Sequence, residues 1–461
     1  MLKAAFFTTV AWLPAIAFSQ DRSGPESLEE KVVRLEAELA QARAELAARE
    51  AMPELEAEAE GSDFPPETSK QADVPAPIEQ KDEERAGFYL GDLRIGGAIR
   101  ANFVLGDYTH NGTTAPQRGG HGGNFELDTF RINLDYDRGE PGFLAKAEYR
   151  WYDGYNFAHT AWLGWRFEDD SVLQAGLNRV PFGAGPYGTS HNWFFDLGYY
   201  VGLTDDMDLG LNYRKEAGDW TLDLAYYAAA EPNFRGATAD SARYSYDIVD
   251  NGSPNSHYRE RHQVNLRAIR HFSFGEDRSF DAGASFQAGL LEADPRFAND
   301  SHQLAAAVHG TYQRGPWEVV AQLTGYDYAA DYRPGTGLSN DLIGMGAYDF
   351  EFPVASRGLL PAVGIAYTWE PENNDWFDSI TFYDDFSILL KDGCDNAGVS
   401  LNDSAMNVLG MAIARGGWYV YVDWAYSNGN YFIGNESFTN FGANRGQRWQ
   451  SRFNINFGYY F

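Results

Sequence analysis

The chain has 461 residues, a net charge of −30, many tyrosines and phenylalanines, and one cysteine, Cys394. Beyond the first twenty residues no window of eighteen apolar residues occurs, which excludes a helical membrane protein. A lone cysteine excludes an internal disulfide framework, and the excess of acid argues against a nucleic-acid partner. Much of that excess, 19 acids against 8 bases, lies in residues 21–87.

The first twenty residues have the layout of a cleavable secretory signal. Lys3 precedes an apolar run over residues 4–18 that contains the small residues Ala15 and Ala17. This run is too short to span a bilayer comfortably. We therefore expect residues 1–20 to be a signal peptide and the mature chain to begin near Asp21.

Residues 21–51 carry apolar side chains at alternating steps of four and three. These positions are Leu28, Val32, Leu35, Leu39, Ala42 and Leu46. Such a seam predicts a short coiled coil of two or three chains, with a lone surface helix as the alternative. Residues 52–87 are rich in glutamate, proline and alanine, which predicts a disordered acidic tether.

The body, residues 88–461, breaks into sixteen segments of alternating hydrophobicity. They are 93–105, 124–137, 142–152, 158–168, 171–182, 207–215, 219–230, 258–274, 278–292, 301–314, 316–330, 359–371, 377–391, 403–415, 418–430 and 447–461. Short connectors alternate with mostly long ones, which is typical of a sixteen-stranded antiparallel transmembrane β-barrel. A soluble β-sandwich is the competing architecture. Residues 347–354 resemble a further strand, but Pro353 and the even strand count assign them to a folded external loop.

Alternation also predicts which side chains face the interior of the barrel. One contiguous group of interior cations, the basic wall, consists of Arg94, Arg100, Arg131, Lys146, Arg150, Arg166 and Arg452. A second basic column is predicted at Arg259, Arg261 and Arg267, with Tyr258 facing lipid. Interior carboxylates are expected at Asp223, Asp281, Glu318, Asp385 and Asp423. Asp384 falls on the lipid face of its strand, which we attribute to a bulge.

The connector from Gly183 to Asp206, named here the inward loop, is aromatic and free of lysine and arginine. Its predicted constriction residues are Trp193, Phe194, Phe195, Asp196, Tyr199, Tyr200, Asp205 and Asp206. A loop this hydrophobic is expected to fold into the barrel and narrow it. Its acids would then face the basic wall and create a transverse field across a constriction. Alternatively, its aromatic residues form a stacking slide for carbohydrate rings.

The chain ends in a strand with an apolar or aromatic side chain at every second position. These are Phe453, Ile455, Phe457, Tyr459 and Phe461. The segment resembles the carboxyl-terminal targeting signal of bacterial outer-membrane proteins, whose terminal phenylalanine is read by the barrel-assembly machinery. The resemblance implies an outer-membrane location among lipid and lipopolysaccharide, with the amino-terminal arm in the periplasm.

Several stretches resemble the phosphate-selective porin O and P family. They are LQAGLNRVPFG (173–183), SITFYDDFSIL (379–389), WYVYVDWAYSNGN (418–430) and RFNINFGYYF (452–461). The resemblance implies a sixteen-stranded trimeric barrel, often preceded by a short coiled coil, and a passive pore with anions as the default solute. Peptidoglycan is a further candidate partner of the coiled coil.

The expected function is a passive channel for small hydrophilic solutes with a mild anion preference, which requires no catalysis and no cofactor. The nine histidines show no metal-like spacing, so no metal site is predicted. An outer-membrane lipid hydrolase would need serine and histidine on adjacent outward faces. His262 lies on such a face without a hydroxyl partner two residues away. An adhesin, which would use the long loops, remains another alternative.

Overall fold

The structure is a computed structural model that describes most of the predicted barrel. The described residues are 87–106, 124–152, 155–232, 243–275, 277–348, 350–372, 376–430, 433 and 449–461. The predicted signal peptide and coiled coil, and the tether up to residue 86, lie outside them. In the part of the chain described, no helix is long and apolar enough to cross a membrane.

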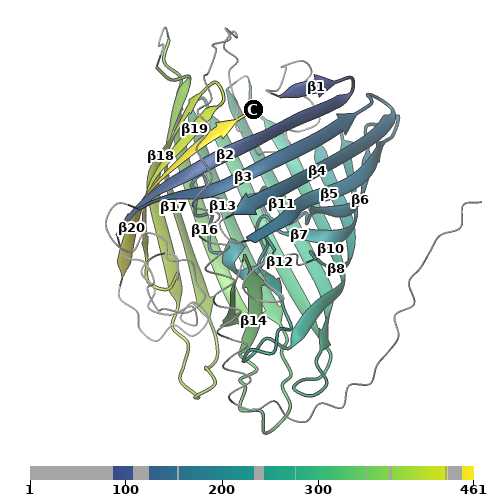
Figure 1. Cartoon of the computed structure of the whole chain (residues 1–461), viewed down its shortest axis with the longest axis vertical. Helices are drawn as coiled ribbons and strands as arrows, with labels where there is room; N and C mark the ends of the chain where they lie inside the picture. The colour runs from purple at the N-terminus through teal and green to yellow at the C-terminus, as the bar shows by residue number, and fades with distance from the viewer. Residues whose placement is uncertain are drawn as a thin grey trace, which may run out of the picture. The chain divides into compact units, whose positions relative to one another are not determined.

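Sixteen antiparallel strands form one closed ring, because β20 pairs with both β19 and β2 while β8 pairs with β10. Figure 1 shows the closure where β20 meets β2. The strands are β2 (Leu93–Gly106), β3 (Asn124–Asp137), β4 (Gly142–Tyr152), β5 (Tyr155–Arg166), β6 (Val172–Arg179), β7 (Met207–Ala217), β8 (Trp220–Ala230), β10 (Tyr258–Ser273), β11 (Arg278–Ala293), β12 (Ser301–Arg314), β13 (Trp317–Tyr328), β16 (Arg357–Trp369), β17 (Ser379–Lys391), β18 (Ser404–Arg415), β19 (Trp418–Ser427) and β20 (Gln450–Tyr460). The predicted architecture is confirmed, and β1 (Phe88–Leu90) adds a short hairpin on β2.

The alternation that predicted the strands is visible in their burial. In β8, Leu222 and Leu224 are 41% and 53% exposed, whereas Asp223 between them is 4% exposed. Large apolar side chains therefore cover the outside, and polar ones point into the ring. Tight turns join strands at one end, with Gly315 and Gly416 at φ 52° and 50°, a conformation that glycine adopts without strain.

Three short strands form a separate sheet in the long-loop region. β14 (Leu342–Ala347) pairs with β15 (Phe350–Ala355) on one side and with β9 (Asp247–Ile248) on the other. None of them pairs with a barrel strand in the described residues. The expectation that residues 347–354 belong to a folded loop is confirmed. The sheet packs in one apolar cluster with residues of the inward loop.

Register shifts mark bulges in four barrel strands, β3, β5, β8 and β10, and those in β3 and β10 change the facing of predicted site residues. The pairing of β2 with β3 shifts between Arg100 and Ala101, and the pairing of β10 with β11 shifts between Arg261 and Val264. The bulge expected at Asp384 is wrong, because the register of β17 with both neighbours has no shift there. Asp384 instead lies exposed on the outer face and accepts a hydrogen bond from the Asn407 amide at 2.6 Å.

Candidate functional site

The basic wall is formed by side chains of β2, β3, β4, β5 and β20, five neighbouring strands of the ring. Its residues alternate with exposed apolar side chains on the same strands. Arg131 is 1% exposed, between Phe130 and Ile132, and the latter is 36% exposed. The strands therefore bring the predicted cations onto one inner surface. Their role in conduction stays a prediction.

Four carboxylates, three on β3 and one on β4, partly neutralise this wall. Asp135 contacts Arg94 at 2.8 Å and Lys146 at 3.9 Å. Arg100 lies 2.9 Å from Asp128, the residue that the β3 bulge adds to the interior. The remaining pairs are Arg131 and Arg150 with Glu148, and Arg166 with Asp137. Six of the seven wall cations thus pair with four carboxylates, which leaves a positive excess.

Arg452 is buried against the inward loop rather than facing open space. Its guanidinium carbon lies 5.6 Å from the ring centre of Trp193 and 5.2 Å from that of Phe194, and a side-chain nitrogen donates to Asn454. A desolvated guanidinium on an aromatic face is worth about 2 kcal/mol. Arg452 therefore holds the loop in place.

The second basic column is only partly present in the interior. The bulge between Arg261 and Val264 inserts one residue, with His262 at φ 51°, and reverses the facing of everything before it. Arg267 faces inward and pairs with Asp223 at 2.9 Å. The predicted inward facing of Arg259 and Arg261 is wrong. Both are on the other face, whereas Tyr258, predicted to face lipid, is fully buried.

The inward loop crosses the interior and bonds to strands far from its own, as predicted. Close to β6, the backbone amides of Gly183 and Ala184 donate to side chains of β11 and β13. Farther along, the amides of Trp193 and Leu197 donate to side chains of β19 and β17. Its only regular element is the 3-10 turn η1 (Tyr199–Val201). Anchors on β11, β13, β17 and β19 therefore hold the loop inside the ring.

His191 makes the central polar contacts between the inward loop and the barrel strands, and this role was not predicted from the sequence. Its Nδ1 lies 2.8 Å from Asp385 and its Nε2 lies 2.9 Å from Glu318, and Asn192 also donates to Asp385 at 2.7 Å. Burial opposes the charged imidazole, but the two carboxylates outweigh it and raise the pKa of His191 to about 9. The loop therefore brings a cation to the carboxylates of β13 and β17.

The loop acids do not face the basic wall as predicted. Asp196 accepts hydrogen bonds from the backbone of Thr189 and Gly198 within the loop itself, and burial raises its pKa. Asp205 pairs with Arg179 at 2.7 Å, outside the predicted wall. Asp206 lies among other carboxylates. The predicted transverse field is therefore not formed by these three acids.

The aromatic residues of the loop pack on one another and on neighbouring loops. Phe194, Tyr199 and Tyr200 are at most 3% exposed. Phe195 and Tyr199 have ring centres 4.4 Å apart, and Tyr199 also contacts the ring of Tyr246. Three of the five predicted slide residues therefore offer no open ring face to a sugar.

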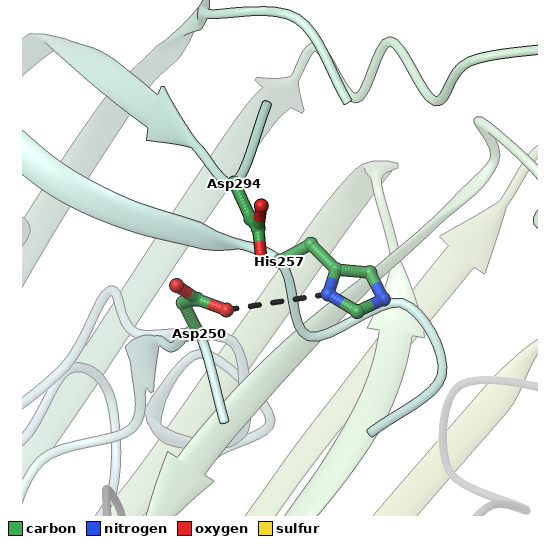
Figure 2. Close-up of side chains that lie close together, drawn as sticks. All are labelled: Asp250, His257 and Asp294. Atoms are coloured by element: carbon green, nitrogen blue, oxygen red, sulfur yellow. Dashed lines mark ion pairs between the residues drawn. The ribbon is translucent and has the colours of Figure 1, made fainter. Parts of the chain in front are cut away.

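Three potential metal-ligating side chains come together where the loops meet the ring. Figure 2 shows Asp250, His257 and Asp294 converging, with the His257 Nδ1 4.0 Å from Asp250. Burial lowers the pKa of His257. Both acids already have arginine partners, since Arg259 lies 2.9 Å from Asp250 and Arg296 lies 2.5 Å from Asp294. Charge in this group is thus locally balanced.

No protein-family model matches the chain, and no curated protein matches it. Among solved structures it is similar to the outer membrane channel DcaP of Acinetobacter baumannii, with 13% identity, 82% of this chain and 100% of that chain covered, and a TM-score of 0.53. OmpF of Salmonella typhi, in complex with daunomycin, has 12% identity, 80% and 97% coverage, and a TM-score of 0.51. The trimer form of OmpT, an outer membrane protein of Vibrio cholerae, has 15% identity, 80% and 99% coverage, and a TM-score of 0.49.

At these identities the similarity to DcaP and OmpF establishes the fold alone. The chain has the closed-barrel fold of outer-membrane channels. The narrower resemblance to phosphate-selective porins stays a prediction.

Proposed function

We propose that the protein is an outer-membrane porin, a passive diffusion channel for small hydrophilic solutes with a mild anion preference. The observation that carries this proposal is the closed ring with an apolar outside, a charged inside and a loop anchored across it. Lipid outside and water inside are the two environments that this distribution fits. The same distribution supports an outer-membrane location, and the resemblance of the terminal strand to a targeting signal implies an amino-terminal arm in the periplasm and a terminal Phe461 read by the barrel-assembly machinery.

The anion preference rests on the positive excess of the basic wall. Arg94, Arg100 and Lys146 have the most exposed side chains of the wall, at 17%, 14% and 37%. Rings or walls of arginine and lysine favour anions in a pore because they attract counter-charge at short range. These three residues are therefore the ones expected to act on passing solutes.

The test is the reversal potential of the purified channel in a planar bilayer under a salt gradient. Changing Arg94, Arg100 and Lys146 together to alanine should shift selectivity from anions toward cations. Arg131 is left unchanged because it is 1% exposed and its loss would perturb folding. The matched control changes Arg261, Arg270 and Arg278 to alanine. These residues lie on the outer face or at a turn, so the control changes the net charge by the same amount outside the interior.

An equal shift in the two triple variants would overturn the anion-preference proposal, since selectivity would then follow net charge alone. Absence of any conductance from folded protein would overturn the channel itself. Block of conductance by added oligosaccharide would instead favour the carbohydrate-selective alternative, for which the buried rings of Phe194, Tyr199 and Tyr200 give no support.

Among the described residues, the chain of contacts Thr221–His271–Asp281 is a structural candidate for an enzymatic function. Thr221 Oγ1 lies 2.8 Å from His271 Nε2, and His271 Nδ1 lies 2.8 Å from Asp281. The Thr221 hydroxyl donates its hydrogen to Glu216, however, so it can only accept from His271. A nucleophile would have to donate to the imidazole. This geometry therefore favours a structural role over catalysis.

We further propose that the barrel self-associates, as a trimer. A carboxylate is unfavourable on a lipid-facing surface, and Asp384 lies in the middle of β17 on the outer face, satisfied only in part by Asn407 among the contacts described. A second copy covering this surface would remove Asp384 from lipid. Crosslinking and mass measurement in detergent test the trimer, and Asp384→Ala probes this surface.

A further inference from the structure

Five carboxylates gather where the inward loop returns to the barrel. Asp206 is the last residue of that loop, and Asp208 follows in β7. Glu231 follows β8, Asp247 belongs to β9, and Glu260 belongs to β10. All five are at most 7% exposed. One oxygen each of Asp206, Asp208 and Asp247 lie within 4.8 Å of one another. We call this group the carboxylate cluster.

Several oxygens of the cluster are buried without a hydrogen-bond partner. These are Asp206 Oδ1, Asp208 Oδ1 and Glu231 Oε2. In two of these residues the other carboxylate oxygen is held by a hydrogen bond. Asp208 Oδ2 accepts from the Gln263 side chain, and Glu231 Oε1 accepts from the Ser245 backbone amide. Buried oxygens without donors are unfavourable, because they lose water and gain nothing in return. The arrangement therefore calls for a further partner.

The described residues supply one cation to this cluster. Arg243 contacts Asp247 at 2.9 Å, so five potential negative charges meet a single guanidinium. Carboxylates that lie this close repel one another when ionised, and a bound cation would remove this repulsion.

The Asp250–His257–Asp294 group of Figure 2 provides a contrast. It too brings three potential metal ligands within 4.8 Å, and its buried His257 Nδ1 lacks a hydrogen-bond partner. Each of its acids is neutralised by its own arginine, however. A divalent ion would have to displace those arginines, whereas it would find unmatched carboxylates in the cluster around Asp206.

We propose that Asp206, Asp208 and Asp247, supported by Glu231, bind a calcium ion that joins the inward loop to the barrel wall. Calcium takes six to eight oxygen ligands at about 2.3–2.6 Å in flexible geometry, so oxygens up to 4.8 Å apart can share one ion. All four residues offer only oxygen, which disfavours zinc, for which nitrogen and sulfur ligands are common.

The ion would join the end of the inward loop and the adjoining start of β7 to the three-stranded loop sheet. Asp206 ends the inward loop, Asp208 begins a barrel strand, and Asp247 lies in the three-stranded loop sheet. Removing calcium should therefore loosen the return of the loop. The expected consequences are a lower thermal stability and larger fluctuations of the open-channel current in chelator.

The experiment uses full-length protein refolded in detergent without lipopolysaccharide, which itself binds calcium. Equilibrium dialysis with radioactive calcium measures stoichiometry and affinity, and thermal unfolding is followed with calcium or with EDTA. We expect one ion per chain and a higher unfolding temperature with calcium. Asp206→Asn and Asp208→Asn should each weaken binding about tenfold or more, because affinity depends on ligand charge. Both should also abolish the calcium-dependent stabilisation.

Matched controls distinguish this site from the neighbouring group. Asp250→Asn and Asp294→Asn remove acids from the Figure 2 group and should leave calcium affinity unchanged. Glu231→Gln provides a milder change, should either aspartate variant fail to fold, and should also weaken binding. Wild-type protein that binds no calcium and unfolds identically in EDTA would overturn the proposal. Loss of binding in Asp250→Asn with normal binding in Asp208→Asn would overturn it as well.

Discussion

The two sides of the barrel interior differ in charge and in what the inward loop places against them. On the basic wall, six of the seven cations pair with four carboxylates, and the loop presents the aromatic rings of Trp193 and Phe194 to Arg452. Along β13, β17 and β19 lie Glu318, Asp385 and Asp423, which we call the acidic arc. There the loop presents the imidazole of His191 and two backbone amides.

This difference shows how a loop without lysine or arginine can lie across a charged lumen. Its aromatic side chains match guanidinium groups, and its few polar donors match carboxylates. In the proposed channel, the electric field then runs between the basic wall and the acidic arc, with the inward loop between them. Of the loop acids named from the sequence, Asp196 bonds within the loop, Asp205 pairs with Arg179, and Asp206 belongs to the carboxylate cluster.

The largest expected effect comes from removing an anchor in the acidic arc. Asp385→Ala deletes the acceptor of three hydrogen bonds from His191 and Asn192. Breaking a buried charge pair destabilises by about 3–5 kcal/mol. Denaturant unfolding in detergent should show this loss, together with noisier single-channel current. The control Asp281→Ala breaks the half-exposed His271–Asp281 pair and should cost less than about 1 kcal/mol. Equal losses would show that the loop does not depend on this anchor.

A somewhat smaller effect is expected from raising the pH. The folded-state pKa of His191 is about 9, above the unfolded value of 6.5. Its charge therefore contributes fully below pH 6.5, and the contribution is lost as pH rises through about 9. A shift of this size corresponds to about 3 kcal/mol. The unfolding free energy should fall between pH 6.5 and 9 in wild type and fall less in His191→Gln. Parallel curves for the two proteins would contradict the assignment.

On the basic wall the corresponding change is Arg452→Lys, which keeps the charge and removes the planar group that lies against Trp193 and Phe194. We expect a loss of about 2 kcal/mol, because the contact is desolvated. Arg270→Lys makes the same exchange over Trp220 at an exposed site, where about 0.5 kcal/mol is expected. Denaturant unfolding compares them. If the two variants lose the same amount, the contact does not stabilise the loop.

The regular strands could be predicted from sequence because alternation in β2, β3 and β4 is uninterrupted where their wall residues lie. The course of the inward loop could also be predicted from its aromatic composition. The residues to which the loop binds could not be predicted. His191 meets Asp385 across 194 residues of chain, and no local pattern encodes such a pairing. The carboxylate cluster was missed for the same reason, since its five members lie in or beside four different strands, β7, β8, β9 and β10.

The bulge in β10 explains the largest error in the predicted facing of side chains. It also leads to the smallest predicted change in stability. Period-two alternation assumes one residue per step, so one inserted residue reverses every earlier side chain. Arg261 therefore lies outside, 37% exposed, in a pair with Glu292, while Arg267 lies inside against Asp223. Arg261→Ala should change stability by less than about 0.5 kcal/mol and leave the reversal potential unchanged.

Arg267→Ala is the internal comparison for that result. It removes an interior cation from the same strand and leaves Asp223 buried without its guanidinium, so it should lower stability and shift selectivity toward cations. Without the bulge, Arg261 and Arg267 would share one face and their substitutions would act alike on ion selectivity. If the reversal potential shifts as much for Arg261→Ala as for Arg267→Ala, the uninterrupted second basic column predicted from the sequence would be supported instead.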